Sequence, residues 1–289
     1  MNNVKTVGLM ALLGGILVVV GGALGSTGGA AIGLVIAVVM NFSMYYWSDR
    51  LAMAAARAKP VEEHELPNVY TIVRSLAQRE NMPMPRIFFI DQPQPNAFAT
   101  GRNPKHAAVA VTRGILDLMS HQELEGVLAH ELGHVKNRDI LISSVAATIA
   151  VALMFITRMA MFRALFGGRR DDNNPIAGII GLLSIIIAPL AAMVIRSAIS
   201  RSREFEADRT GAQLTGSPIA LASALKKLEA GTTRVPMDVS PAVSPLFIAD
   251  PLKAFGRRGQ SGGMSRLFST HPPIPERVER LEKMAMGIR

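Results

Sequence analysis

The first 48 residues contain an uncharged stretch that is longer than water-soluble proteins usually have. No charged residue occurs between Thr6 and Ser48, and a glycine-rich segment, Gly25 to Gly29, interrupts the stretch near its middle. Each half is about 20 residues long, which is the length that a helix needs to cross a bilayer. Residues 1–48 are therefore expected to form a transmembrane hairpin. A cleaved signal peptide is the alternative for the first half, but no convincing cleavage site followed by a polar segment is present.

The charges that flank this hairpin predict its orientation. Lys5 precedes the first half, whereas Arg50, Arg57 and Lys59 follow the second. Because positively charged residues are retained on the cytoplasmic side, both ends of the hairpin are expected to be cytoplasmic. Residues 49–139 are then expected to be cytosolic.

Two further apolar runs bring the expected number of transmembrane helices to four. Residues 140–157 and 176–195 carry no charge; the first run is at the short end for a span, and the second contains Pro189. The linker 163–174 holds three arginines, which is unusual for a loop on the outer side. Residues 140–199 are therefore expected to form a second transmembrane hairpin, or one that is only partly inserted in the membrane.

The composition excludes several classes of protein. The chain has 289 residues, of which 49% are hydrophobic, and it contains no cysteine. Disulfides and thiolate metal sites are excluded, so any metal must be held by histidine and carboxylate. The net charge is +9, but the basic residues flank apolar runs and no aromatic residues alternate with them. We therefore expect contact with the lipid bilayer and no nucleic-acid partner.

A metal-binding pattern follows the cytosolic segment. Residues 130–134 read H-E-x-x-H, and positions four apart share one face of a helix, so His130 and His134 can reach one metal ion. Glu131 lies beside them and can take a proton from water. Ser120 and Glu123 have the spacing of a capping box at the start of such a helix. A chance occurrence of the pattern, with a structural histidine pair, is the alternative.

Two later segments contain residues that suit the same site. Glu204 can complete a set of two histidines and a carboxylate for Zn²⁺, and Asp208, one helical turn on, can hold the other ring nitrogen of a ligand histidine. A solvated acidic helix face is the alternative for this pair. His271 precedes two prolines, which can present it rigidly; taken alone, it is more typical of a capping or surface histidine.

The cytosolic parts are expected to form an α+β domain with a small β-sheet. A helix begins at Pro67, and strands are predicted over residues 86–91, 96–101 and 107–112. An exposed edge strand of such a sheet can pair with an extended peptide; a purely structural hairpin is the alternative. Residues 200–289 are expected to contain a helix over 214–228, a mobile loop over 232–269 that is rich in Pro, Gly and Ser, and a charged terminal helix.

Four motifs in this order resemble one family. They are N-A-F-A-T-G from Asn96, H-E-L-G-H from His130, S-R-E-F-E-A-D from Ser202 and S-T-H-P-P-x-x-x-R from Ser269. Together with the membrane hairpin between the metal motifs, the chain resembles, over nearly its whole length, the HtpX branch of the M48 membrane metalloproteases. The resemblance implies a multi-pass protein of the bacterial inner (plasma) membrane, with a gluzincin-type zinc endopeptidase domain facing the cytoplasm. The implied substrates are misfolded membrane proteins or unfolded polypeptides, cleaved in protein quality control.

The resemblance also implies roles for individual residues. One Zn²⁺ per chain would be held by His130, His134 and Glu204, with Glu131 as general base. Asp208 would support a ligand histidine, and His271 would stabilise the tetrahedral intermediate. Arg277 would contact the substrate backbone. The strand that pairs with substrate would be Asn96, Ala97, Phe98, Ala99 and Thr100.

Three alternative functions remain open at this point. A CAAX-type prenyl-peptide protease belongs to a related branch, but four spans are few for the large intramembrane chamber of that branch. A non-enzymatic membrane scaffold with a vestigial site, and a structural zinc site, are the others. The intact set of His130, Glu131, His134 and Glu204 argues against the scaffold, and the lack of a fourth ligand argues against a structural site. The sequence predicts no oligomeric state.

Overall fold

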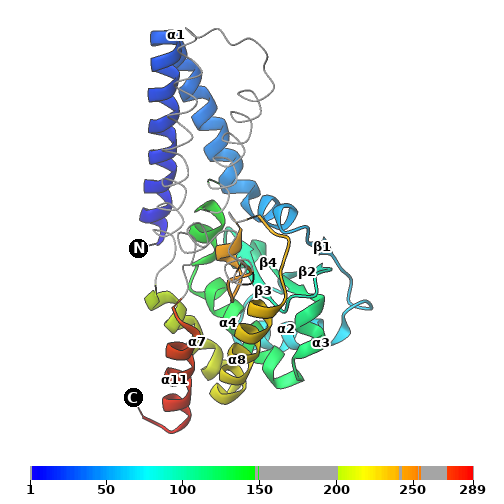
Figure 1. The fold of residues 1–289 in the computed structure, drawn as a ribbon. Coiled ribbons are helices and arrows are strands. Elements are labelled where there is room, and N and C mark those ends of the chain that lie inside the picture. Colours follow the sequence, from blue (N-terminus) through cyan, green and yellow to red (C-terminus); the bar gives the residue numbers. More distant parts are fainter. Residues whose placement is uncertain are drawn as a thin grey trace.

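The amino-terminal helix α1, Asn2–Ala55, folds back on itself to form two antiparallel legs (Figure 1). The reversal lies at Ser26, whose φ of 56° is in the left-handed region. Asn41 Nδ2 on the second leg donates to the backbone oxygen of Met10 on the first, at 3.1 Å. A methyl group on Gly33 would overlap with the carbonyl oxygen of Leu17, so the absence of a side chain lets the two backbones approach closely.

The structure is a computed structural model that describes residues 2–146, 149, 201–240, 243–252, 254 and 272–288. Within these ranges one stretch, Ser26–Ser43, is long and apolar enough to cross a membrane, and a shorter apolar helical stretch covers Thr6–Val19. Most of the expected second hairpin, 140–199, and His271 lie outside the described residues. The expectation of four transmembrane helices is therefore not tested.

The sheet has four strands in the order β1-β2-β4-β3. The strands are β1 Lys59–Pro60, β2 Arg86–Ile90, β3 Ala97–Gly101 and β4 Ala107–Thr112. β2 and β4 are parallel, with Arg86 opposite Ala108, whereas β3 and β4 are antiparallel, with Ala97 opposite Val111. β1 is antiparallel to β2. β3 is consequently an edge strand, although all five of its residues are buried.

Helices complete the domain. Their bounds are α2 Pro67–Arg79, η1 Pro104–His106, α3 Arg113–Leu118, α4 His121–Lys136, α7 Arg201–Thr215, α8 Pro218–Arg234, η2 Ser244–Leu246 and α11 Ile274–Ala285. The helix expected from residue 214 begins later, because Gly216 between α7 and α8 has a φ of 69° and breaks the helix. The three strands predicted from the sequence are present, and the short β1 and α3 were not predicted.

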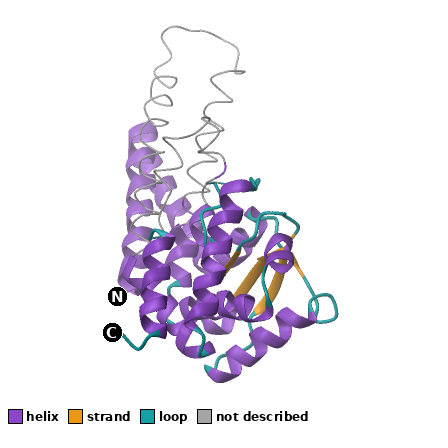
Figure 2. Ribbon diagram, turned by 60° about the horizontal axis from the view of Figure 1, so that its bottom comes forward, coloured by secondary structure: helices purple, strands orange, loops and turns teal. Residues whose placement is uncertain are grey.

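The sheet divides the core into two layers (Figure 2). Alternate residues of β4 face opposite sides, as a pleated strand requires. Val109 and Val111 face a cluster built from α2, α4, α8 and α11, whereas Ala108 and Ala110 face a cluster that includes the end of α1. Met237, Val243, Leu246 and Phe247 also belong to that second cluster. The expectation of a mobile loop over 232–269 is therefore wrong for two described parts, because residues 232–234 belong to α8 and residues 243–249 are buried.

Candidate metal centre

The helix α4 begins with the capping box that its sequence predicts. Ser120 Oγ accepts from the backbone of Glu123, and the Glu123 carboxylate accepts from the backbone N–H of Ser120 at 2.8 Å. This cap fixes the start of the helix. Ten residues on, the helix places His130 and His134 on one face, with ring centroids 4.8 Å apart.

Two glycines bring α7 against this face. A Cβ on Gly211 of α7 would lie 2.8 Å from the backbone nitrogen of His130, and a Cβ on Gly133 of α4 would lie 3.3 Å from the carbonyl oxygen of Ala207. The two helices can therefore approach more closely than larger residues would permit. Their approach carries Glu204, the fourth residue of α7, to the histidine pair.

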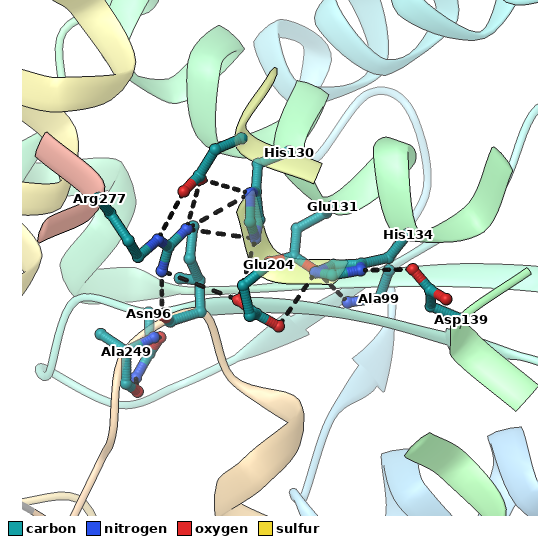
Figure 3. Close-up of polar contacts among 11 residues, drawn as sticks. Asn96, Ala99, His130, Glu131, His134, Asp139, Glu204, Ala249 and Arg277 are labelled. Carbon is teal, nitrogen blue, oxygen red and sulfur yellow. Dashed lines mark hydrogen bonds and ion pairs between the residues drawn. The ribbon is translucent and has the colours of Figure 1, made fainter. Parts of the chain in front are cut away.

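The three side chains converge (Figure 3). Ligand atoms of His130, His134 and Glu204 all lie within 4.8 Å of one another. The Nε2 atoms face the carboxylate, with His130 Nε2 3.8 Å from Glu204 Oε2 and His134 Nε2 3.5 Å from Glu204 Oε1. Two imidazole nitrogens and one carboxylate are a donor set that Zn²⁺ uses in catalytic sites. The residues present thus fit the metal that the sequence predicts.

Each histidine has a carboxylate on its other ring nitrogen. His130 Nδ1 lies 2.9 Å from Asp208 Oδ1, and His134 Nδ1 lies 3.3 Å from Asp139 Oδ2. Such partners fix the tautomer and the orientation of a metal-ligand histidine. Asp208 has the position that its spacing from Glu204 predicted. Asp139 was not predicted; the available signal was an aspartate shortly after the second histidine, at the start of the next helical segment.

The two histidines differ in their titration. Burial lowers the pKa of His130 to about 4, and the positive charge of Arg277 acts in the same direction. Burial would also lower the pKa of His134, but Glu204 and the hydrogen bond to Asp139 outweigh it and raise this pKa to about 9. His130 is therefore neutral near pH 7, whereas His134 would have to lose a proton before its Nε2 could bind a cation.

Arg277, on α11, is fully buried beneath this centre. Its Nε and NH2 atoms donate to the two oxygens of Asp208 at 2.8 and 2.7 Å. Burial would raise the pKa of Asp208, but the charge and hydrogen bonds of Arg277 hold it well below its usual range. NH1 donates to the carbonyl oxygen of Ile248 at 3.3 Å. The contact expected with substrate backbone is thus made here with the backbone of the chain itself.

The side chain of Glu131, on α4, points to the edge of the sheet. Its Oε2 accepts from the backbone N–H of Ala99 on β3 at 2.7 Å, and the residue is 2% exposed. Ala99 also lines the small cavity that contains the ligand side chains. The candidate base and the edge strand are therefore parts of one site.

The residues predicted to pair with substrate lie on this edge, but not all of them face the metal centre. Asn96 Nδ2 donates to the carbonyl oxygen of Ala249 at 2.8 Å. Ala97 accepts a backbone hydrogen bond from Ile248 at 3.0 Å. Phe98 points to the other side, into the core, where its ring lies 4.8 Å from that of Phe247.

Comparison with known proteins adds the family. Residues 63–285 match the model described as peptidase family M48. The chain belongs to this family. The resemblance to the M48 family that the four motifs indicated is confirmed. The protein is a membrane-associated metalloprotease.

Two curated relatives match over nearly their full length. A protease HtpX homolog from Pelotomaculum thermopropionicum is 51% identical, over 99% of this chain and 100% of the length of that homolog. One from Thermodesulfovibrio yellowstonii is 49% identical, over 99% of each chain. The crystal structure of S. mikatae Ste24p is 21% identical with a TM-score of 0.49, and covers 96% of this chain and 65% of that one.

Proposed function

We propose that the chain is a zinc-dependent endopeptidase that cleaves misfolded or damaged membrane proteins, and unfolded polypeptides, on the cytosolic side of the bacterial inner (plasma) membrane. The observation that carries this proposal is the convergence of His130, His134 and Glu204 beside Glu131 and the edge of β3. A metal centre, a general base and a strand that can pair with a peptide are the parts that peptide hydrolysis needs.

One Zn²⁺ would be held by His130, His134 and Glu204. When bound there, it supplies a Lewis acid that polarises a carbonyl and makes water more acidic. Asp208 and Asp139 keep the ligand nitrogens turned toward it. No cysteine or further acidic group is needed for this arrangement.

Glu131 moves the protons of the reaction. We propose that its carboxylate takes a proton from the attacking water and later delivers that proton to the nitrogen of the leaving peptide. The N–H of Ala99 donates to Oε2 and so holds the carboxylate toward the site. His271, which the resemblance assigns to the tetrahedral intermediate, stays a prediction.

The membrane assignment is supported by α1. Its Ser26–Ser43 stretch is apolar enough to cross a bilayer, and both legs of the hairpin point from the reversal toward the catalytic domain (Figure 1). Arg50, Arg57 and Lys59 follow the second leg. The positive-inside rule puts that side in the cytoplasm.

The test compares zinc content and cleavage in wild type and Glu131→Gln. Both full-length proteins are purified in detergent and given an unfolded model protein. We expect about one zinc in each and cleavage by the wild type alone, because the amide cannot accept the proton. Glu125→Gln, on the same helix but away from the centre, is the matched control and should cut normally. Cleavage by Glu131→Gln at the wild-type rate would refute the mechanism.

A second measurement defines the substrate. If the wild type binds zinc and leaves unfolded protein intact but cleaves a prenylated peptide, the proposed substrate class is wrong. If it binds zinc and cuts neither, the endopeptidase proposal fails.

A further inference from the structure

The site is closed to a polypeptide in this structure. The cavity beside the metal-binding side chains has a volume of only about 30 Å³. A pocket for a small organic ligand has roughly 300–1,000 Å³, so this cavity holds little more than a water molecule. One wall must move before a peptide bond can reach Glu131.

The walls differ in how firmly they are built. α4, α7 and β3 belong to the framework of the domain. The rest of the lining comes from Asp139, Ile140 and Ser143, which follow α4 in the chain, and from Pro245, Leu246 and Ile248, which lie in or just after the single turn of η2. We call residues 244–249 the covering segment. Within the part of the chain that the structure describes, one backbone hydrogen bond, from Ile248 N to Ala97 O, joins this segment to β3.

The covering segment begins with the turn of η2, and the residues that follow this turn are bound through their main chain. A sheet edge recognises a peptide through its main chain and so accepts many sequences. Here the outward carbonyl of Ala97 accepts from Ile248. The Asn96 amide binds both main-chain groups of Ala249, donating to its oxygen at 2.8 Å and accepting from its nitrogen at 3.3 Å. Arg277 NH1 donates to the carbonyl oxygen of Ile248 at 3.3 Å.

The side chains of the covering segment indicate which substrate side chains fit the site. Leu246 and Ile248 are apolar and line the cavity beside Glu131. The neighbouring Phe247 points the other way, against Phe98. Leu246 ends the turn of η2, whereas Phe247 has extended backbone angles (φ −75°, ψ 144°), which turn its side chain away from that of Ile248.

We propose that the covering segment occupies the place of the substrate as an internal pseudosubstrate, and that a polypeptide enters by displacing it. The expected substrate is an extended stretch with a branched apolar residue where Ile248 lies, as an unfolded protein exposes. The substrate would then form the hydrogen bonds that Asn96, Ala97 and Arg277 now form with the covering segment, and these bonds offset the free energy that opening costs. This inference rests on the proposed function, because it concerns regulation of that same site.

The first test uses Ile248→Pro in the full-length, zinc-loaded protein in detergent. Proline has no N–H, so it removes the bond to Ala97 without changing any side chain of the metal centre. Loss of one backbone hydrogen bond shifts an open–closed equilibrium by about fivefold. We therefore expect cleavage of an unfolded protein to rise about fivefold. Ile248→Val keeps the N–H and a branched side chain, so it should cut several times more slowly than Ile248→Pro. An unchanged or lower rate for a folded Ile248→Pro protein would overturn the inference.

The second test does not depend on a proline variant that folds. Glu131→Gln protein is mixed with an unfolded polypeptide, and amide hydrogen exchange is followed in peptides that cover residues 243–252 and α8. We expect added polypeptide to speed exchange in residues 243–252 and to leave α8 unchanged. Retained protection of residues 243–252 while the polypeptide is bound would overturn the inference.

The two tests separate this inference from the proposed function. If neither wild type nor Ile248→Pro cuts any polypeptide although both bind zinc, the endopeptidase proposal fails. Faster exchange in residues 243–252 under those conditions still supports displacement of the covering segment. If the wild type cuts while the segment stays protected, the function stands and the pseudosubstrate is refuted.

Discussion

At the scale of single residues, the metal centre depends on two carboxylates that are not metal ligands themselves. Asp208 and Asp139 each contact the Nδ1 of one histidine, which leaves both Nε2 atoms directed at Glu204. Asp208 is in turn held by Arg277. The orientation of the metal ligands is thus determined by charges on other parts of the chain.

The contact between Asp139 and His134 gives the first prediction. Asp139→Asn should lower zinc affinity about tenfold, because an amide supports the imidazole less strongly than a carboxylate does. A competition titration against a coloured chelator measures the affinity directly. Asp91→Asn removes an exposed carboxylate that is paired with Arg113, and it should leave zinc affinity unchanged. Equal affinities for the two variants would contradict the role of Asp139.

The sequence predicted those site residues that local spacing determines. His130 and His134 share a face because they are four apart, and the same spacing relates Glu204 to Asp208. The burial of Arg277 beneath His130 could not be predicted, because it depends on how α11 packs against α7. Spacing reports on one helix at a time and carries no information about its neighbours.

At the scale of elements, the start of α4 is also an electrostatic junction. Burial would raise the pKa of Glu123, but hydrogen bonds from Lys227, Ser223 and Ser120 outweigh it and lower this pKa to about 2. Lys227 Nζ lies 2.7 Å from the carboxylate, and Ser223 Oγ donates to it at 2.6 Å. The cap of α4 is therefore tied to α8.

This junction predicts acid sensitivity. The pKa of Glu123 is lower in the folded chain than its usual value of 4.5, so its contribution is complete above that value. It is lost as pH falls from about 4.5 to about 2, and amounts to about 3 kcal/mol. Thermal unfolding in detergent, repeated across this range, should show a flatter pH dependence for Glu123→Gln than for wild type. Parallel curves would contradict the assignment.

The legs of α1 give an element-scale prediction about packing. Gly33 meets the backbone of Leu17, whereas Gly15 has nothing within 4 Å of the position of an added Cβ. Gly33→Ala should force the legs apart and destabilise the hairpin by about 2 kcal/mol. Gly15→Ala should be neutral or stabilising, since alanine favours a helix more than glycine does. Tm values of the two variants in detergent test this, and a Gly33→Ala protein as stable as Gly15→Ala would refute it.

Elements with strong local signals were predicted well, and those made by distant contacts were not. The Ser120 cap and the strands of alternating or continuous apolar residues were predicted because their signals lie within a few residues. β1 has only two residues, Lys59 and Pro60, and exists through its pairing with β2. The covering segment was expected to be part of a mobile loop, because its composition gives no hint that Phe247 meets Phe98.

At the scale of the whole molecule, the apolar surface and the catalytic domain are separated. Large apolar side chains remain exposed along α1, among them Val19, Ile32, Val35 and Val38. Their number on one element is typical of a surface that meets lipid, since monomeric soluble proteins rarely expose such a patch. Both legs of α1 point toward the domain, so the reversal at Ser26 is the part of α1 most distant from it (Figure 1).

This arrangement predicts on which side of the membrane each part lies. The chain contains no cysteine, so a single introduced thiol is its only labelling site. His64→Cys lies on the exposed surface of the domain, and Thr27→Cys lies exposed beside the reversal of α1. A membrane-impermeant maleimide should label His64→Cys only in inverted vesicles and Thr27→Cys only in right-side-out ones, because a spanning hairpin puts these sites on opposite sides. Both should react once detergent opens the vesicles. Labelling of both sites from the same side would mean that α1 lies along the membrane and does not cross it, and the metal centre would then need another route to membrane-protein substrates.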